Sequence, residues 1–193
     1  MDILSSNDFE NEKFNEISSF EKDLSGKSFV MTEFENCDFT KCDLTSSVFE
    51  SCAFHNCNIS LANFNGTRLQ GVFFNECKVL GIDFMKCDQF ALKTGFVKCL
   101  LKSCNFSEMN INKTKFSDCE ICECDFINSS LTEAVFSGSV FKDTVFMNSD
   151  LQKADFSDAC GYDINPLNNI VKKAIFSMPD AVSLIRHLGV IIR

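Results

Sequence analysis

The sequence lacks most of the residues from which enzymes build active sites. It has no tryptophan, one tyrosine, two prolines and two histidines in 193 residues. With only His55 and His187 available, a Ser-His-Asp or Cys-His system has little to build on. The sequence also has no phosphate-binding loop motif and no glycine-rich dinucleotide fingerprint. We therefore expect a protein that is not an enzyme and that uses no cofactor or metal.

Long apolar runs and a basic footprint are also absent. No apolar stretch approaches the length needed to span a membrane. The first eight residues are acidic and lack the basic and apolar regions of a signal peptide. The net charge is −9, whereas direct nucleic-acid binding normally needs a basic patch. We expect one soluble, cytoplasmic domain that binds neither a membrane nor nucleic acid directly.

The acidic residues gather in two blocks of the chain. Residues 1–50 hold 12 acids and 4 bases, and residues 111–163 hold 10 acids and 4 bases. The segments 51–110 and 164–193 carry a small excess of bases. Two acidic blocks suit a basic partner, although they also serve solubility alone.

A large apolar residue, at a position we call i, stands at every fifth place over most of the chain. The series runs from Leu24 to Phe84, restarts at Phe96 and ends at Phe156. Its 26 positions hold 16 of the 22 phenylalanines. Neither a helix nor an ordinary strand has a period of five. Self-similarity at a fixed period is typical of a solenoid.

The twelve cysteines follow the same period. Nine of them lie at i−2, where small residues fill 22 of the 26 slots. Cys119 and Cys122 have the spacing of a zinc-ligand pair, but no second pair stands in a matching arrangement. A free cysteine is small and readily buried, so a packing role in a reducing compartment is favoured over a metal site or disulfides. Cys122, at i+1, and Cys160, beyond the last repeat, are the expected exceptions.

The repeat resembles that of the pentapeptide-repeat family, whose consensus is A(D/N)Lxx. Segments 37–40 (CDFT), 62–65 (ANFN) and 154–157 (ADFS) carry the resemblance, which covers roughly residues 20–160. It implies an all-β solenoid, a right-handed quadrilateral β-helix of pentapeptide repeats with a short C-terminal α-helix. Four pentapeptides make one square turn, and the i and i−2 side chains fill its interior.

Three segments follow from this interpretation. Residues 21–160 are expected to form the β-helix, with a register break at 85–95 where two extra residues make a bulge or kink. This break is interpreted as a tolerated local insertion, with a functional hinge as the alternative. Residues 1–20 are expected to form a degenerate first turn or cap, in which Leu4 keeps the phase. Residues 161–193 are expected to form closing turns and a C-terminal helix.

The predicted helix opens at Ser177, a good N-cap, and stops at Gly189. Its apolar stripe could serve only to cap the solenoid. Alternatively, the ending at residues 183–191 resembles the tail of quinolone-resistance and microcin-immunity pentapeptide proteins, which implies a homodimer. The predicted dimer contacts are Ala181, Leu184, Ile185, Leu188, Val190, Ile191 and Ile192.

The same resemblance implies a DNA mimic. Such an acidic rod binds DNA gyrase or topoisomerase IV, both type II topoisomerases, and protects the enzyme from quinolones or peptide toxins. The chain lacks the long projecting loops that some of these proteins use. The acids predicted to contact a partner are Asp23, Asp43, Asp83, Asp118, Glu120, Glu123, Asp125, Asp143, Asp150, Asp155 and Asp158.

Other interpretations stay open. Asp or Asn at i−1 belongs to the family consensus because it helps to fix the turn, so these acids need not touch a partner. A non-enzymatic interaction scaffold with an unrelated protein partner also fits the repeat. A protein that sequesters a small molecule or toxin fits less well, because a core packed with phenylalanine leaves no cavity. A continuous acidic strip along a dimer would favour the mimic, and scattered acids or a monomer would favour the scaffold.

Overall fold

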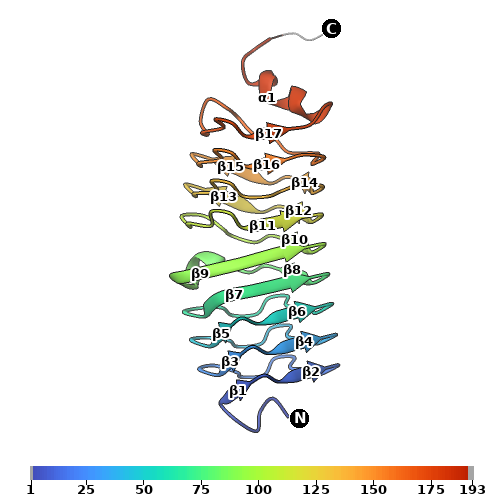
Figure 1. Cartoon of the computed structure of the whole chain (residues 1–193), viewed down its shortest axis with the longest axis vertical. Coiled ribbons are helices and arrows are strands. Elements are labelled where there is room, and N and C mark those ends of the chain that lie inside the picture. The colour runs from blue at the N-terminus through green and yellow to red at the C-terminus, as the bar shows by residue number, and fades with distance from the viewer. Residues whose placement is uncertain (1, 191–193) are drawn as a thin grey trace.

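The computed structural model describes residues 2–190 and shows a column of stacked four-sided turns with the termini at opposite ends (Figure 1). The predicted fold class is confirmed: strands from successive turns pair in parallel, and one short α-helix lies near the C-terminus. The described helices include none that is both long and apolar enough to cross a membrane.

Most strands are short because each occupies one side of a turn. In the first half they are β1 (Asp8–Glu10), β2 (Lys13–Asn15), β3 (Ser28–Val30), β4 (Glu33–Glu35), β5 (Val48–Glu50), β6 (Ala53–His55), β7 (Arg68–Asn75) and β8 (Lys78–Leu80). In the second half they are β9 (Asp88–Val97), β10 (Leu100–Lys102), β11 (Lys115–Ser117), β12 (Glu120–Cys122), β13 (Asp125–Ile127), β14 (Val140–Lys142), β15 (Val145–Met147), β16 (Asp155–Phe156) and β17 (Ile175–Phe176). Strands β7 and β9 are longer, because they continue around a corner onto a second side. The helical pieces are the 3₁₀ turns η1 (Phe84–Lys86) and η2 (Asp180–Val182) and the helix α1 (Ser183–Arg186).

Strand pairing defines four faces, which we name by their strands. The β2–β17 face holds β2, β4, β6, β11, β16, β17 and the C-terminal parts of β7 and β9. The β1–β7 face holds β1, β3, β5 and the N-terminal part of β7. The β8–β14 face holds β8, β10, β12 and β14, and the β13–β15 face holds the remaining pair. In regular turns a residue pairs with the one 20 positions later, as Phe14 does with Phe34.

Phenylalanine rings stack along the interior of the β2–β17 face. Neighbouring ring centroids are 4.6 to 5.5 Å apart, and the planes lie within 17° of parallel. Offset stacks of this kind contribute about 0.5–1.5 kcal/mol per pair beyond burial. The stacked residues are Phe14, Phe34, Phe54, Phe74, Phe96, Phe116, Phe136, Phe156 and Phe176.

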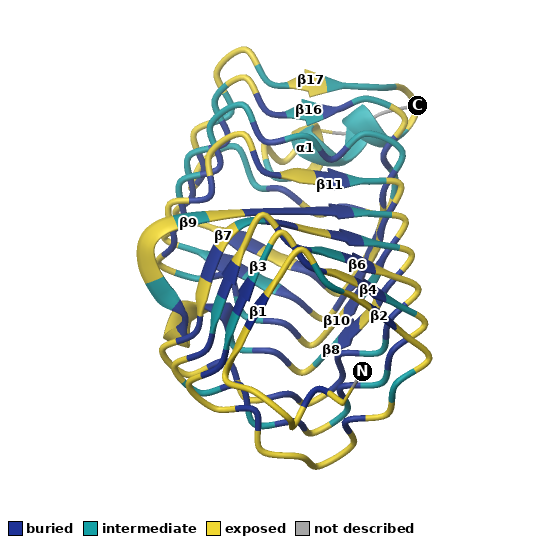
Figure 2. Ribbon diagram, turned by 60° about the horizontal axis from the view of Figure 1, so that its bottom comes forward, coloured by how far each residue is buried: buried dark blue, intermediate teal, exposed yellow. Residues whose placement is uncertain are grey.

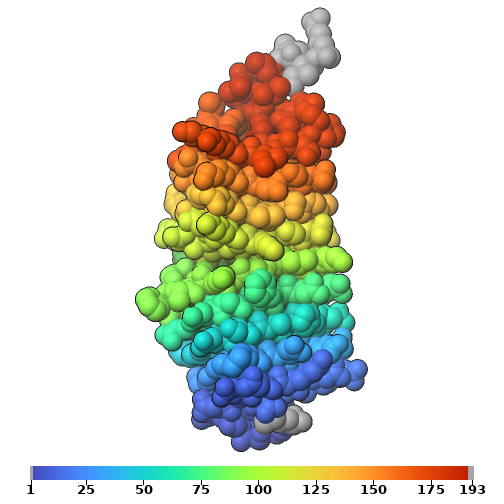
Figure 3. Space-filling model, viewed as in Figure 1, coloured from blue at the N-terminus to red at the C-terminus, as the bar shows by residue number. Residues whose placement is uncertain are grey.

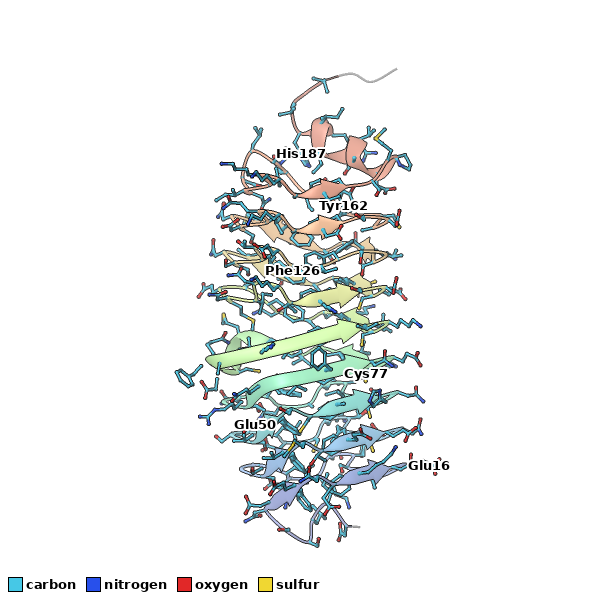
Figure 4. The ribbon with its side chains drawn as sticks, viewed as in Figure 1. Glu16, Glu50, Cys77, Phe126, Tyr162 and His187 are labelled. Atoms are coloured by element: carbon cyan, nitrogen blue, oxygen red, sulfur yellow. The ribbon has the colours of Figure 1, made fainter. Side chains whose placement is uncertain are left out.

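The cysteines pack inside the column as predicted for i−2. All twelve are free thiols, and all except Cys160 are buried. The Cys37 N–H donates to Cys57 Sγ, and the Cys57 N–H donates to Cys77 Sγ, each at 3.4 Å. Figure 4 shows Cys77 and Phe126 within the stack of turns. Small polarisable thiols therefore fill space and satisfy backbone donors between turns.

Cys122 is an exception to this inward packing, as predicted. It occupies the outward i+1 position of β12 and does not belong to the hydrophobic core, although its side chain is buried. It lies in register between Lys102 of β10 and Lys142 of β14. Long lysine side chains cover neighbouring surface with their methylene groups, which accounts for the burial of the smaller thiol.

The N-terminal end is closed by a different residue from the one expected. Ile3 is buried, whereas Leu4 is 44% exposed, so the predicted phase of Leu4 is wrong. A turn closed by the Ser5 N–H and the Asp2 carbonyl (3.0 Å) brings Ile3 inward. Lys27, at an i−2 slot, is also buried; its ammonium group donates to the Ser6 carbonyl and lies 5.7 Å from the centre of the Phe9 ring.

A β-bulge interrupts the regular stacking where the extra residues lie. The pairing of β7 with β9 shifts register twice, between Arg68 and Val72 of β7. The two extra residues push the segment around Phe90 outward, and the Phe90 side chain is 78% exposed. Figure 2 shows this part of β9 as an exposed bow at the edge of the solenoid.

The C-terminal helix is shorter than predicted and begins differently. Ser177 is not its N-cap, because the Ser177 hydroxyl accepts the Asp158 N–H of the preceding turn at 3.0 Å. Asp180 likewise accepts the Gly161 N–H at 3.0 Å. The expected N-cap Ser177 therefore binds the last turn of the solenoid, as Asp180 does, and η2 precedes the one-turn α1. Gly189, with φ +70°, follows as the expected stop.

Candidate partner-binding surfaces

Four of the predicted partner-contacting acids lie in one column. Asp23 pairs with Asp43 in the next turn, and Asp83 and Asp125 both pair with Asn105 between them. Their positions follow the β13–β15 face along the axis. The column is not wholly acidic, because Asn63 and Asn105 occupy two of its levels.

Several of these carboxylates fix the turn that follows them. Asp43 Oδ1 accepts the Thr45 N–H at 3.0 Å and the Thr45 hydroxyl at 2.6 Å. Asp155 Oδ1 accepts the N–H and hydroxyl of Ser157 in the same way, at 2.9 and 2.5 Å. Asp23 and Asp150 also accept the N–H two residues ahead, and hydrogen bonds from Ser25 lower the pKa of Asp23. The turn-fixing role of the i−1 acid is therefore present in the structure.

Two further predicted acids are engaged by lysines. Asp83 lies 3.3 Å from the Lys86 ammonium group. Glu123 lies 3.2 Å from Lys102 and accepts a hydrogen bond from the Ser103 hydroxyl at 3.0 Å. The hydrogen bond from Lys102, followed by that from Ser103, lowers the pKa of Glu123. Both carboxylates are solvent-accessible, so their ion pairs contribute little to stability.

The other five predicted acids form no ion pair within residues 2–190. They surround β12 on the β8–β14 face and its two corners, and Asp125 lies beyond one corner, at the start of β13 on the β13–β15 face. Glu120 lies on β12, Asp118 and Asp125 flank it, and Asp143 lies one turn above Glu123. Asp158 lies two turns above Asp118, beyond Gly138. We call Asp118, Glu120, Asp125, Asp143 and Asp158 the C-terminal acidic patch.

Many further acids lie at i+2 and are not among the predicted contacts. Backbone φ is positive at i+2 throughout the regular turns, as at Glu16 (54°) and Glu76 (56°). This conformation turns the chain at each corner, and Figure 4 shows Glu16 pointing away from the column. Glu16, Glu76 and Asp118 belong to the same corner series. The five-residue period itself could have identified these corner acids, because they share one phase of it.

The predicted dimer contacts divide into two groups. Leu184 packs against the core and Ala181 is half-buried, so both help to close the solenoid. Ile185, Leu188 and Val190 are 37%, 52% and 52% exposed, and they leave an apolar surface at the C-terminal end. Ile191 and Ile192 lie outside the described residues.

His187 ties the terminal segment to the last turn through its Nε2, which lies 2.8 Å from Asp163 Oδ1. Beside this contact is a cavity of about 550 Å³ lined by Tyr162, Ser183 and Arg186, among others. Burial, with a smaller effect of Asp180, raises the pKa of Tyr162 to about 12. The phenol is therefore neutral at physiological pH and supplies no nucleophile.

No group of three or more His, Cys, Asp or Glu side chains suited to a metal occurs in the described part of the chain.

Comparisons with known proteins agree with this architecture. Residues 32–71 and 124–160 match the family model for pentapeptide repeats, with eight copies. The solved structure of full-length QnrB1, a plasmid-mediated fluoroquinolone resistance protein, has a TM-score of 0.73 at 19% identity and covers 95% of this chain and 90% of QnrB1. A trypsin-treated variant of QnrB1 gives a TM-score of 0.74, also at 19% identity, covering 96% of this chain and 90% of that one. Among curated proteins, none matches the sequence.

Proposed function

Since this chain is a pentapeptide-repeat protein, we propose that it is an acidic rod that occupies the DNA-binding surface of a type II topoisomerase, DNA gyrase or topoisomerase IV. By competing with DNA there, it protects the enzyme from quinolones or peptide toxins. It acts in the cytoplasm as a non-catalytic homodimer joined at the C-terminal end.

The observation that carries this proposal is the C-terminal acidic patch. Its carboxylates are not neutralised by ion pairs within residues 2–190, so their charge remains available to a basic partner. Turns of the solenoid stack at about 4.8 Å, the spacing of neighbouring strands, whereas duplex DNA carries a charge per about 1.7 Å of axis. One acid per turn therefore gives a lower charge density along the axis than DNA has. A patch that wraps a corner, such as Asp118 with Glu120, places more than one acid in a turn and approaches the charge density of DNA.

The exposed apolar end supports the dimeric form. A dimer through Ile185, Leu188 and Val190 would cover side chains that are otherwise in contact with water. An end-to-end dimer would also double the length of the acidic rod. The fold of QnrB1 adds support at the level of architecture, because a resistance protein uses the same scaffold.

The test is DNA supercoiling by purified gyrase, and decatenation by topoisomerase IV, with and without ciprofloxacin. We expect the protein to restore activity under the drug or, alone, to inhibit it with increasing dose. The double variant Asp118→Lys/Asp143→Lys should need at least about tenfold more protein for the same effect, since each reversal places like charges against a basic surface. Glu10→Lys/Glu50→Lys, on the β1–β7 face, makes the same change of net charge and should behave as the native protein.

An interaction scaffold with an unrelated partner is the second candidate. The distribution of the acids favours it, because Asp150 lies on the β1–β7 face and Asp155 on the β2–β17 face, away from the patch. No effect on either topoisomerase at about 10 µM protein, a concentration at which specific complexes of ordinary affinity form, would reject the DNA mimic in favour of the scaffold.

A further inference from the structure

A groove lies where the bulged strand β9 crosses the corner between the β1–β7 and β2–β17 faces. Its volume is about 620 Å³, and its lining includes Phe73, Leu92, Lys93, Lys113 and Lys115. Figure 3 shows the green β9 segment projecting beyond the turns on either side. The groove is separate from the C-terminal acidic patch, which surrounds β12 on another face.

The groove exists because of a glycine and an insertion. Gly95 pairs with Phe73 in the turn below and with Lys115 in the turn above, so the outward position between them has no side chain. The Phe73 ring fills part of this space, since a Cβ on Gly95 would lie 3.0 Å from two of its ring carbons. The bulge raises Gln89 to Ala91 beside the gap and forms the second wall.

The groove combines a small apolar part, Phe73, Ala91 and Leu92, with polar and cationic lining residues. Phe73 is 50% exposed, and Phe90, which lies at the tip of the bulge outside the lining, is 78% exposed. The i-position phenylalanines of the repeats are all buried, so these two rings are not needed by the core. Leu92 packs partly against the core and supplies an apolar floor. Exposed aromatic side chains around a concave site are typical of peptide-binding surfaces.

The rim of the groove is cationic although the chain carries a net charge of −9. Lys93 and Lys115 are exposed and form no ion pair within residues 2–190. Lys113 lies 3.6 Å from Glu133, but Glu133 is held more closely by Lys153, at 2.9 Å. The nearby Asp88 is paired with Arg68 at 3.1 Å. The positive charge of the rim is therefore not balanced locally.

The polar wall also offers hydrogen-bond donors. Asn112 Oδ1 accepts the Thr132 N–H and the Ser130 hydroxyl, each at 2.8 Å. This use of its oxygen directs the amide NH₂ of Asn112 toward other partners. Three ammonium groups and this amide suit a ligand that presents oxygen acceptors with negative charge.

The geometry points to a second binding site, which takes an acidic protein segment carrying an aromatic or large apolar residue. The apolar residue would contact Phe73 and Leu92, and the flanking carboxylates would meet Lys93, Lys113 and Lys115. Duplex DNA fits less well, because the three lysines span only two turns and a longer polyanion would meet the acidic faces beside them. This site does not depend on topoisomerase binding, and it would serve a partner of opposite charge to the one proposed above.

The test is fluorescence anisotropy with a labelled peptide that has one Phe flanked on each side by two Glu. We expect saturable binding that weakens as salt rises, and at least about tenfold weaker binding when Gln replaces Glu or Ala replaces Phe. Lys93→Glu/Lys115→Glu should also weaken binding at least about tenfold, and Phe73→Ala should weaken it separately. These side chains are exposed, so melting temperatures should match the native protein.

Lys78→Glu/Lys142→Glu is the control, since it makes the same charge change with exposed lysines on the β8–β14 face. Equal loss of binding in this control would show a general charge effect and overturn the proposal. The proposal would also fail if binding of the peptide does not saturate at concentrations up to about 1 mM, which corresponds to weak recognition. A labelled 20-base-pair duplex that binds more tightly than the peptide, with the same loss in the groove variant, would assign the groove to nucleic acid instead.

Discussion

At the scale of single residues, position in the five-residue period decides the role of a side chain. Phe126 at i is fully buried, with ring centroids 5.0 Å from both Phe106 and Phe146 in the turns below and above. Phe90 belongs to the same residue type but lies in the bulge and is mostly exposed. The same side chain therefore stabilises the fold at position 126 and contributes little to its stability at position 90.

Phe126→Ala should lower the free energy of unfolding by about 3–5 kcal/mol, because it removes a buried ring and leaves a cavity between stacked neighbours. Urea denaturation followed by circular dichroism measures the change. Phe90→Ala is the control and should change the unfolding free energy by less than about 0.5 kcal/mol. Comparable losses in both variants would contradict the stacked core.

The buried thiols give the protein a pH dependence on the alkaline side. Burial, assisted by the nearby Asp43 and Asp23, raises the pKa of Cys42 to about 12, and burial raises that of Cys52 to about 11. An unfolded thiol ionises near pH 8.5. The unfolded chain therefore loses these protons first, and the free energy of unfolding should be constant below about pH 8 and fall as the pH rises toward 11.

Urea midpoints measured from pH 7 to 10.5 check this expectation. Cys42→Ser/Cys52→Ser should show a shallower fall, since serine does not titrate in this range and already occupies the equivalent slot at Ser47. A midpoint that is independent of pH up to 10.5 in the native protein would be inconsistent with neutral buried thiols.

At the scale of elements, the C-terminal segment closes the end of the solenoid and also leaves an apolar surface exposed to solvent. A helix of one turn is not stable alone, so α1 depends on its contacts with the solenoid. Leu184 supplies the apolar contact, and the pair of His187 with Asp163 holds the end of the segment. Ile185 and Leu188 remain exposed and are not needed for closure.

Ile185→Asp/Leu188→Asp should convert the proposed dimer into a monomer with little change in melting temperature, because charges would enter the apolar contact while closure is kept. Light scattering after size exclusion measures the mass of the particle. Leu184→Asp is the contrasting variant and should lower the melting temperature by several degrees through loss of core packing. A native protein that is monomeric at about 100 µM would reject the dimer.

The sequence predicts the regular elements better than the irregular ones, and the reason is physical. From Leu24 to Phe84 and again from Phe96 to Phe156 each side chain has an equivalent one turn away, so a single rule places them. Ser177 and Asp180 have no such equivalent, and both bind the last turn instead of starting the helix. The burial of Cys122 depends on lysines in two other turns, and the groove depends on Gly95 meeting Phe73 across a shifted register, so neither feature follows from the five-residue rule.

At the scale of the whole molecule, the solenoid carries an acidic surface and a cationic groove in different places. The C-terminal acidic patch and the groove at β9 lie on different faces and have opposite charge. A rigid column keeps them at a fixed separation, because every turn contacts only its neighbours and none can rotate alone. The molecule could therefore hold a basic and an acidic partner at the same time without a hinge between them.

The direction of the backbone hydrogen bonds has a mechanical consequence. They run along the axis from each turn to the next, as from Leu44 to Asn63 and from Leu24 to Asp43. A pull between the two ends loads the bonds of one terminal turn at a time, rather than many strands in shear. Under tension the chain would peel away turn by turn, in steps of about 20 residues, so this solenoid is a stiff rod in compression but a weak tether in extension.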